Sequence, residues 1–206
     1  MMRSSGATIT SVTPTINRPS LLLTVESFLH QVRFREDRCL ILGDGCWRPA
    51  WLPEHPQVLY LHRPKRGNFG HEHILWALQE GFVTTDYFYL QNDDDAWLPD
   101  AFESIRPALS RAGGMWCVPN YDENGLVPKY HFHVPDGGLV RAKKDGGPMI
   151  VRIAGLHPFI PNRGPWKWTD LTEDGPFFRE QADRFTLGLW PKPVAINWAP
   201  ATPKAV

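Results

Sequence analysis

Three consecutive carboxylates, Asp93, Asp94 and Asp95, follow an apolar, aromatic run at residues 86–91 and precede a segment that starts at Pro99. Adjacent carboxylates repel one another, so a fold that keeps them together needs a compensating partner. Mg²⁺ and Mn²⁺ take oxygen ligands, often one or two carboxylates together with substrate phosphates. A solvated acidic turn that caps the following helix explains the same triplet. The triplet alone leaves a metal site and a turn as equal alternatives.

Two further acidic segments could do chemistry. Asp44 lies in a Gly-Asp-Gly segment after an apolar run, and Glu173 and Asp174 stand just before Pro176. A carboxylate beside an acceptor hydroxyl acts as a general base, which contributes about 10²–10⁴-fold to a rate. On the residues alone, a helix cap is the favoured interpretation of Asp174, and a tight turn explains Asp44 equally well.

One histidine and two tryptophans in the second half are also candidates. His157 could ligate a metal, because imidazole is acceptable to Mn²⁺, but a lone histidine is more often structural. Trp166 and Trp168 could stack on a sugar or a base, and packing in a core or a lid explains them equally well.

The composition is that of an ordinary globular protein. The chain has 206 residues, 42% of them hydrophobic, and 22 basic residues balance 22 acidic ones. A zero net charge excludes a protein that coats polyanions through its overall charge. Cys39, Cys46 and Cys117 have no metal-type spacing, which favours free thiols in a reducing compartment. No apolar stretch approaches the roughly 18 residues of a membrane span, and no signal peptide is evident, so we expect a cytoplasmic protein.

The first half alternates short β-branched runs with amphipathic segments. Five strands are expected, at residues 7–12, 38–42, 58–61, 86–91 and 114–118, with helices over 20–31, around 74–82 and over 99–111. Pro107 is expected to kink or split the last helix. The alternation predicts a mainly parallel, doubly wound α/β sheet with helices on both faces. Such sheets bind ligands outside the carboxyl ends of their strands, so residues 13–18, Asp44 and residues 93–95 should share one site.

The second half is irregular and rich in aromatic residues. Strands are expected at residues 130–134, 149–154 and 194–198, with a basic, glycine-rich mobile loop at 135–148 between the first two. A helix is expected to start at Pro176, and a polar tail to begin at about residue 200.

The motifs occur in an order that resembles a known family. Thr-Pro-Thr-x-Asn-Arg (13–18), Gly-Asp-Gly (43–45), Arg-Gly-Asn-Phe-Gly (66–70), Leu-Gln-Asn-Asp-Asp-Asp-x-Trp-Leu-Pro (90–99) and a later Glu-Asp pair follow one another. The set resembles the GT-A glycosyltransferases, in particular the large family 2 of inverting enzymes that use nucleotide-diphosphate sugars. The resemblance covers residues 7–118 well and 169–185 loosely, while 119–168 match no pattern.

The resemblance implies a Rossmann-like GT-A fold in a single domain, 1–206. Residues 7–118 would form the nucleotide-sugar-binding half, 119–199 an irregular half with the acceptor site and catalytic base, and 200–206 a tail. Nucleotide-sugar binding is assigned to ten residues: Thr13, Pro14, Thr15, Arg18, Asp44, Gly67, Asn68, Gly70, Asp93 and Asp94. In the family the Asp after the second strand meets the base edge, which here is Asp44.

The family's DxD motif, which holds the metal, corresponds to residues 93–95. Asp95 is the expected direct ligand of Mn²⁺ or Mg²⁺ and Asp93 a metal or ribose partner, with His157 as a further candidate. Asn92 stands where many relatives have another Asp, which leaves the register within 93–95 open. The Glu-Asp pair would supply the catalytic base, Asp174, with Glu173 as its neighbour.

The expected function is metal-dependent transfer of a sugar, with inversion, from a nucleotide-diphosphate sugar to an acceptor hydroxyl. A UDP-sugar is the favoured donor, and the acceptor could be a saccharide, a protein or a modified nucleic-acid base. The basic residues 141–144 and Trp166–Trp168 would suit nucleic acid, but the neutral charge makes that a minority interpretation.

Two alternatives remain. A nucleotidyltransferase would usually carry a glycine-rich phosphate loop with a lysine after the first strand, which residues 13–17 do not form. A non-catalytic nucleotide-sugar-binding module would not need the intact acidic triplet and Glu-Asp pair.

Overall fold

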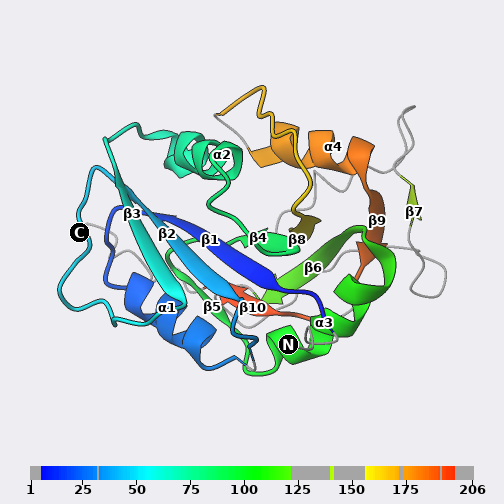
Figure 1. Cartoon of the computed structure of the whole chain (residues 1–206), viewed down its shortest axis with the longest axis horizontal. Coiled ribbons are helices and arrows are strands. Elements are labelled where there is room, and N and C mark those ends of the chain that lie inside the picture. The colour runs from blue at the N-terminus through cyan, green and yellow to red at the C-terminus, as the bar shows by residue number, and fades with distance from the viewer. Residues whose placement is uncertain are drawn as a thin grey trace, which may run out of the picture.

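A computed structural model describes residues 6–31, 33–121, 140–141, 156–171, 174–190 and 192–197. Along these residues, strands and helices alternate in the first half and strands dominate the second (Figure 1). The elements are β1 (Ile9–Thr15), α1 (Leu21–Leu29), β2 (Arg38–Asp44), β3 (Val58–Arg63), η1 (Asn68–Gly70), α2 (His71–Gln79), β4 (Tyr87–Leu90), β5 (Asp95–Trp97), α3 (Ala101–Ala112), β6 (Met115–Tyr121), β7 (Val140–Arg141), β8 (Leu156–Pro161), α4 (Asp174–Arg184), β9 (Thr186–Leu189) and β10 (Ala195–Asn197).

One mixed sheet carries the fold. Its strand order is β3-β2-β1-β4-β8-β6-β10-β5, and β9 pairs with β6 and β7. The four strands β1 to β4 are mutually parallel, as the alternating pattern predicts. The later strand β8 is inserted between β4 and β6 and runs antiparallel to both. The first half is therefore the expected parallel sheet, and the second half completes it with mixed pairing.

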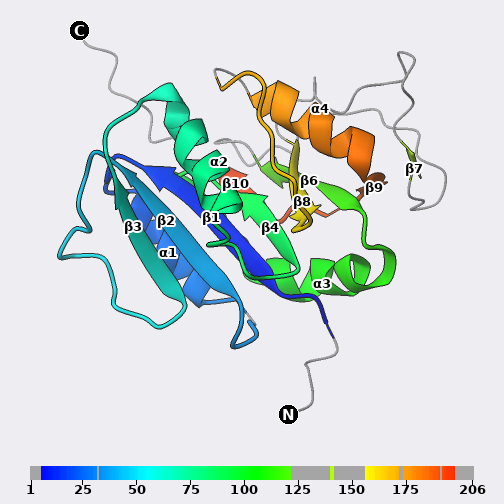
Figure 2. The same ribbon diagram turned by 45° about the horizontal axis from the view of Figure 1, so that its top comes forward.

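Helices cover both faces of the sheet and enclose two cores. On one face, α1 and α3 pack on the sheet around Phe28 and Phe102, both fully buried. On the other, α2 and α4 pack around Ile74 and Phe177. The strand residues alternate between the two cores because successive side chains of a strand point to opposite faces. Figure 1 shows α1 and α3 below the sheet and α2 and α4 above it, and in the turned view of Figure 2 α1 lies behind β2 and β3.

Some expected elements differ from the observed ones. The helix with Pro107 is not split: α3 runs from Ala101 to Ala112 with that proline inside it. The last helix begins at Asp174, two residues before Pro176. The strands β5, β8 and β9 were not expected, and β7 lies inside the predicted basic loop. The strands predicted at 130–134 and 149–154 lie outside the described residues.

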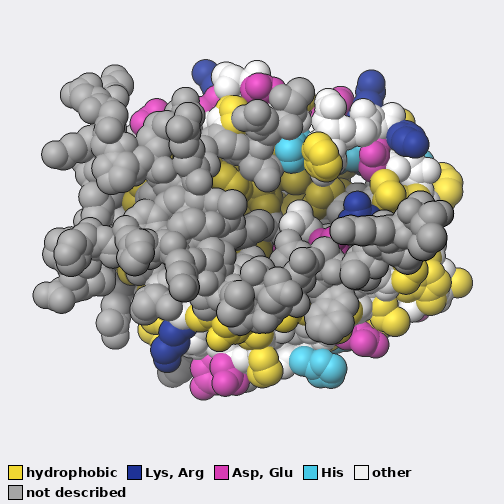
Figure 3. All heavy atoms as spheres, turned by 180° about the vertical axis from the view of Figure 1, so that it is seen from behind, with side chains coloured by type: hydrophobic (Ala, Val, Ile, Leu, Met, Phe, Trp, Pro, Cys, Tyr) yellow, Lys and Arg dark blue, Asp and Glu magenta, His cyan; other side chains and the backbone are white. Residues whose placement is uncertain are grey.

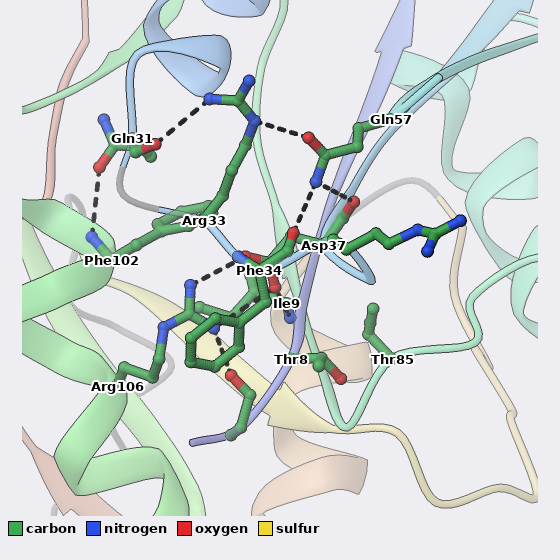
Figure 4. A network of polar contacts seen from close by, with 12 residues as sticks. Thr8, Ile9, Gln31, Arg33, Phe34, Asp37, Gln57, Thr85, Phe102 and Arg106 are labelled. Atoms are coloured by element: carbon green, nitrogen blue, oxygen red, sulfur yellow. Dashed lines mark hydrogen bonds and ion pairs between the residues drawn. The ribbon is translucent and has the colours of Figure 1, made fainter. Parts of the chain in front are cut away.

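A buried ion pair fixes the amino-terminal end of β1, which we call the rear of the sheet (Figure 4). Asp37 is fully buried and accepts hydrogen bonds from the backbone N–H groups of Ile9 (2.8 Å) and Phe34 (2.6 Å). Nη2 of Arg106, from α3, lies 2.8 Å from its Oδ2. The pair thus ties α3 to the strand that ends at Thr15, at the front of the sheet.

Across the described residues, no helix is long and apolar enough to cross a membrane.

Candidate functional site at the carboxyl ends of the strands

The end of β1 meets the acidic triplet directly. Thr15 Oγ1 donates a 2.7 Å hydrogen bond to Asp93 Oδ2. Nη1 of Arg18, three residues further on, lies 3.4 Å from Asp93 Oδ1 and 3.2 Å from Asp94 Oδ2. This contact follows from the parallel pairing of β1 with β4, which brings both carboxyl ends to the front of the sheet. The sequence predicted that residues 13–18 and 93–95 lie at one site. The structure confirms this proximity through direct side-chain contacts.

The third carboxylate of the triplet is buried. Asp95 opens the short strand β5 and is 0% exposed. Its Oδ2 accepts a 3.3 Å hydrogen bond from the backbone N–H of Asn92, whereas its Oδ1 has no hydrogen-bond partner in the described part of the chain. On the backbone side, Thr24 Oγ1 of α1 donates to the carbonyl of Asp95 at 2.7 Å. Asp95 is therefore held in place by hydrogen bonds, but one of its two carboxylate oxygens has no hydrogen-bond partner among the described residues.

Burial shifts the acidity of two of these groups. It raises the pKa of Asp93, which the hydrogen bond from Thr15 and the charge of Arg18 oppose. It raises the pKa of Asp95 to about 7, against the opposing hydrogen bond from the Asn92 backbone. A buried carboxylate with a raised pKa is one for which the protein supplies too little positive charge.

Asp44 belongs to the same end of the sheet but faces a different loop. Its Oδ1 accepts hydrogen bonds from the backbone N–H of Arg66 (2.6 Å), and its Oδ2 from that of Gly67 (3.1 Å). His73 Nε2 of α2 lies 2.9 Å from Oδ1, within the buried interior. Burial raises the pKa of Asp44, but these hydrogen bonds outweigh it and the pKa is lowered. Asp44 thus holds the 66–70 segment, and the expected base contact of this carboxylate stays a prediction.

That segment adopts an unusual backbone. Gly67, Asn68, Phe69 and Gly70 all have positive φ, at 71°, 53°, 52° and 78°. A non-glycine residue in this region costs about 1–3 kcal/mol and is kept where the surroundings enforce it. A Cβ added at Gly70 would lie 2.3 Å from Cβ of Pro14, so only glycine fits there. The two motifs 13–18 and 66–70 are therefore in direct contact, and Asn68 is exposed on the turn.

A second group of contacts, just past the carboxyl end of β1, was not predicted from the sequence. Asn17, with φ of 63°, accepts a 3.0 Å hydrogen bond from the hydroxyl of Tyr60 and donates one of 2.7 Å to the carbonyl of Trp47. The Trp47 ring stacks on His62 at 3.8 Å. An asparagine just past a strand was a usable signal for the left-handed residue, because asparagine tolerates that region. Nothing local in the sequence indicates its partners.

Large apolar side chains reach the surface around this end of the sheet. Ile16, Trp47 and Phe69 follow β1, β2 and β3 and are 58%, 74% and 83% exposed. Figure 3, the view from behind, shows hydrophobic side chains gathered at its right-hand margin. Trp166 and Trp168 differ, since both are buried and the latter stacks on Phe177 at 4.5 Å. Core packing is thus the correct alternative for these two tryptophans.

Three of the remaining predicted site residues lie in the second half, and Thr13 lies in β1. His157 is in β8, in register with Val118, and only its backbone is described. Asp174 is the first residue of α4, again described by its backbone alone, and Glu173 lies outside the described residues. Thr13 is fully buried, and its hydroxyl has no hydrogen-bond partner among the described residues. The roles assigned to these residues stay predictions.

Comparisons with known proteins identify the fold. The sequence matches no protein-family model and, at a significant level, no curated protein. The structure resembles crystal structures of S. aureus TarS, all at 10% identity. For residues 1–349 of TarS the TM-score is 0.64, covering 92% of this chain and 60% of that one; for the longer TarS structure it is 0.63, covering 93% and 37%. For TarS 1–349 in complex with UDP-GlcNAc it is 0.61, covering 92% and 58%.

The present chain thus spans about 60% or less of the TarS chains that it matches. At such low identity the likeness concerns the fold alone. The described residues have the mixed α/β architecture, a largely parallel sheet flanked by helices, of a GT-A-like glycosyltransferase fold.

Proposed function

We propose that the protein is a metal-dependent glycosyltransferase that moves a sugar from a nucleotide-diphosphate sugar to an acceptor hydroxyl, with inversion. The observation that carries the proposal is the contact of Thr15 and Arg18 with Asp93 and Asp94 at the front of the sheet. In open α/β sheets this end of the strands is where ligands bind. A TarS structure of the same fold was solved with UDP and another with UDP-GlcNAc, which supports a UDP-sugar as the donor to test first.

The acidic triplet has the chemistry of a Mg²⁺ or Mn²⁺ site. Such ions are commonly held by one or two carboxylates and complete their coordination with substrate phosphates. No group of three or more His, Cys, Asp or Glu in the described ranges could hold a metal by itself, so the proposed ion would depend on donor phosphates as further ligands. The unpartnered Oδ1 of Asp95 is the kind of buried oxygen that a cation satisfies. Asp95, with Asp93, would hold the ion, which would stabilise negative charge on the leaving diphosphate.

The chain's own residues would prepare the donor side of the site. Thr15 fixes the orientation of Asp93 through its 2.7 Å hydrogen bond. Asp44 holds the 66–70 segment against Pro14 through two backbone N–H groups. Both arrangements rest on contacts within the chain itself, and preorganisation of this kind lowers the cost of ordering the site on binding.

The acceptor side rests on Asp174. As the general base it would accept the proton of the acceptor hydroxyl while that oxygen attacks the anomeric carbon from the face opposite the diphosphate. One base and an in-line displacement invert the anomeric centre. Glu173 is the expected neighbour of this base, and saccharide, protein and modified nucleic-acid base remain the classes of acceptor to screen.

The decisive experiment measures nucleoside diphosphate released from a panel of nucleotide sugars, with Mn²⁺ or with chelator. Turnover or donor binding that requires the metal is expected for at least one donor. If no donor binds or turns over in a metal-dependent manner, the proposed function is wrong.

Two variants separate the two halves of the reaction. Asp95→Asn should abolish metal-dependent donor binding, while Asp174→Asn should bind donor normally and lose transfer. Asp86→Asn is the matched control, because Asp86 bonds to Thr8 at the rear of the sheet. Full transfer by Asp174→Asn would rule out that residue as the base.

A further inference from the structure

Arg18 covers the acidic triplet from the solvent side. Its guanidinium lies within 3.4 Å of both Asp93 and Asp94, whose side chains are 8% and 16% exposed, whereas its own side chain is 52% exposed. Two nearly buried carboxylates thus share one half-exposed cation. Without it, two adjacent negative charges would stand uncompensated in a poorly solvated place.

The three side chains are anchored to very different degrees. Asp93 is also held by Thr15, and burial restricts Asp94. Within the described residues, Arg18 makes ion pairs with these two carboxylates and no others. Half-exposed ion pairs of a long side chain are weak and easily exchanged. Arg18 is therefore the member of the group that can leave while the carboxylates stay.

We propose that Arg18 is the resident counter-cation of the triplet, which a divalent metal ion displaces and which then turns to the donor diphosphate. This inference rests on the proposed function. The ion, held by Asp95 and Asp93, and the guanidinium would share Asp93, so the two compete for that carboxylate. The displaced guanidinium can donate hydrogen bonds to the diphosphate of the sugar donor, because its planar fork matches the geometry of phosphate oxygens.

The exchange couples the two ligands. Metal alone must displace Arg18 without offering it a new partner, whereas metal together with a diphosphate supplies one. Each ligand then increases the affinity for the other by the same factor, as thermodynamic linkage requires. Arg18 also keeps the triplet neutralised when no metal is bound.

The test measures two affinities of the purified protein by titration calorimetry: Mn²⁺ alone, and UDP at saturating Mn²⁺. For Arg18→Gln, we expect Mn²⁺ to bind about three- to tenfold more tightly, the range that weak exposed ion pairs account for. UDP should bind about tenfold more weakly, because a charge-assisted contact is lost. The opposite signs distinguish displacement from general damage, which would weaken both.

Two further variants make the result specific. Arg48→Gln removes one positive charge from a neighbouring loop, where Arg48 pairs with Glu54 at 3.4 Å, and should leave both affinities at the wild-type values. Arg18→Lys keeps the charge but not the fork, so Mn²⁺ affinity should stay near wild type while UDP affinity falls.

The inference is overturned if wild type binds Mn²⁺ and Arg18→Gln binds it no more tightly. Weaker UDP binding without tighter Mn²⁺ binding would make Arg18 a phosphate contact only. If wild type binds neither Mn²⁺ nor any nucleotide, the proposed function fails as well, so the two failures can be told apart.

Discussion

Two fully buried aspartates stand at opposite ends of the same sheet, and their surroundings differ. At the rear, both oxygens of Asp37 have partners: two backbone N–H groups and the guanidinium of Arg106. At the front, Asp95 has one 3.3 Å hydrogen bond to Oδ2 and no partner for Oδ1 within the described residues. Both are 0% exposed, so burial alone does not distinguish them.

This difference is the one expected if Asp37 supports the fold and Asp95 has the proposed metal-binding role. A buried ion pair whose polar atoms all have partners stabilises one arrangement of the chain, and removing either member of the pair is strongly destabilising. A buried carboxylate with an unpaired oxygen and a pKa of about 7 lowers stability, and such groups are typical of functional sites. Three experiments test whether the two ends of the sheet really differ in this way.

The largest effect is expected at the rear. Asp37→Asn removes the negative charge that faces the buried guanidinium of Arg106 and should cost about 3–5 kcal/mol of unfolding free energy. Urea denaturation followed by circular dichroism measures it. The matched control is Glu54→Gln, which breaks an exposed pair with Arg48 and should change stability by less than about 0.5 kcal/mol. A loss below about 1 kcal/mol for Asp37→Asn would contradict a structural role for the rear pair.

Two glycines with nearly equal φ, one at each end of the sheet, allow a direct comparison of the two ends. Gly70 at the front (78°) has Pro14 against it, whereas Gly81 at the rear (75°) has nothing within 4 Å of an added Cβ. Gly81→Ala should cost about 1–2 kcal/mol from backbone strain alone. Gly70→Ala should cost about 1–3 kcal/mol more, because the methyl group collides with a proline ring, and should also weaken UDP binding. Equal costs in denaturation would show that the 13–18 and 66–70 segments are not tightly packed.

An effect of opposite sign is expected for Asp95. Because its pKa is raised from 3.8 to about 7, the folded protein holds a proton that the unfolded chain has lost. Its contribution to stability is therefore present below about pH 4 and is lost as pH rises through 7. Asp95→Asn should remove this dependence, so its melting temperature in chelator should exceed that of wild type at pH 8. A lower melting temperature at pH 8 would show that Asp95 is paired after all.

Much of this end of the sheet was predictable from sequence. Parallel strands that alternate with helices must deliver their carboxyl ends to one edge, so the segments after β1, β2 and β4 were bound to meet there. The run of three carboxylates then marked the site. Gly70 was assigned to nucleotide-sugar binding, but its contact with Pro14 was not foreseen.

The rest depended on contacts that no local pattern encodes. The sequence of β8 contains Pro158 and Pro161, which argue against an interior strand because proline cannot donate to a ladder. The structure nevertheless pairs them with Cys117 and Tyr87. The bond between His73 and Asp44 was equally hidden, since a histidine on the first turn of a helix has many other uses. Long-range pairing overrode the local signal in both cases.

The insertion of β8 between β4 and β6 has a consequence for how the chain reaches its fold. The two strands that flank it are complete by residue 121, yet they are not paired with each other in the finished sheet. Until residues 156–161 leave the ribosome, each keeps an unpaired edge that can recruit another chain. Synthesis of this protein therefore includes an interval of some 35–40 residues in which β4 and β6 await the strand that pairs with both. At a bacterial or eukaryotic elongation rate of roughly 5–20 residues per second, that wait lasts seconds, long enough for chaperones to matter.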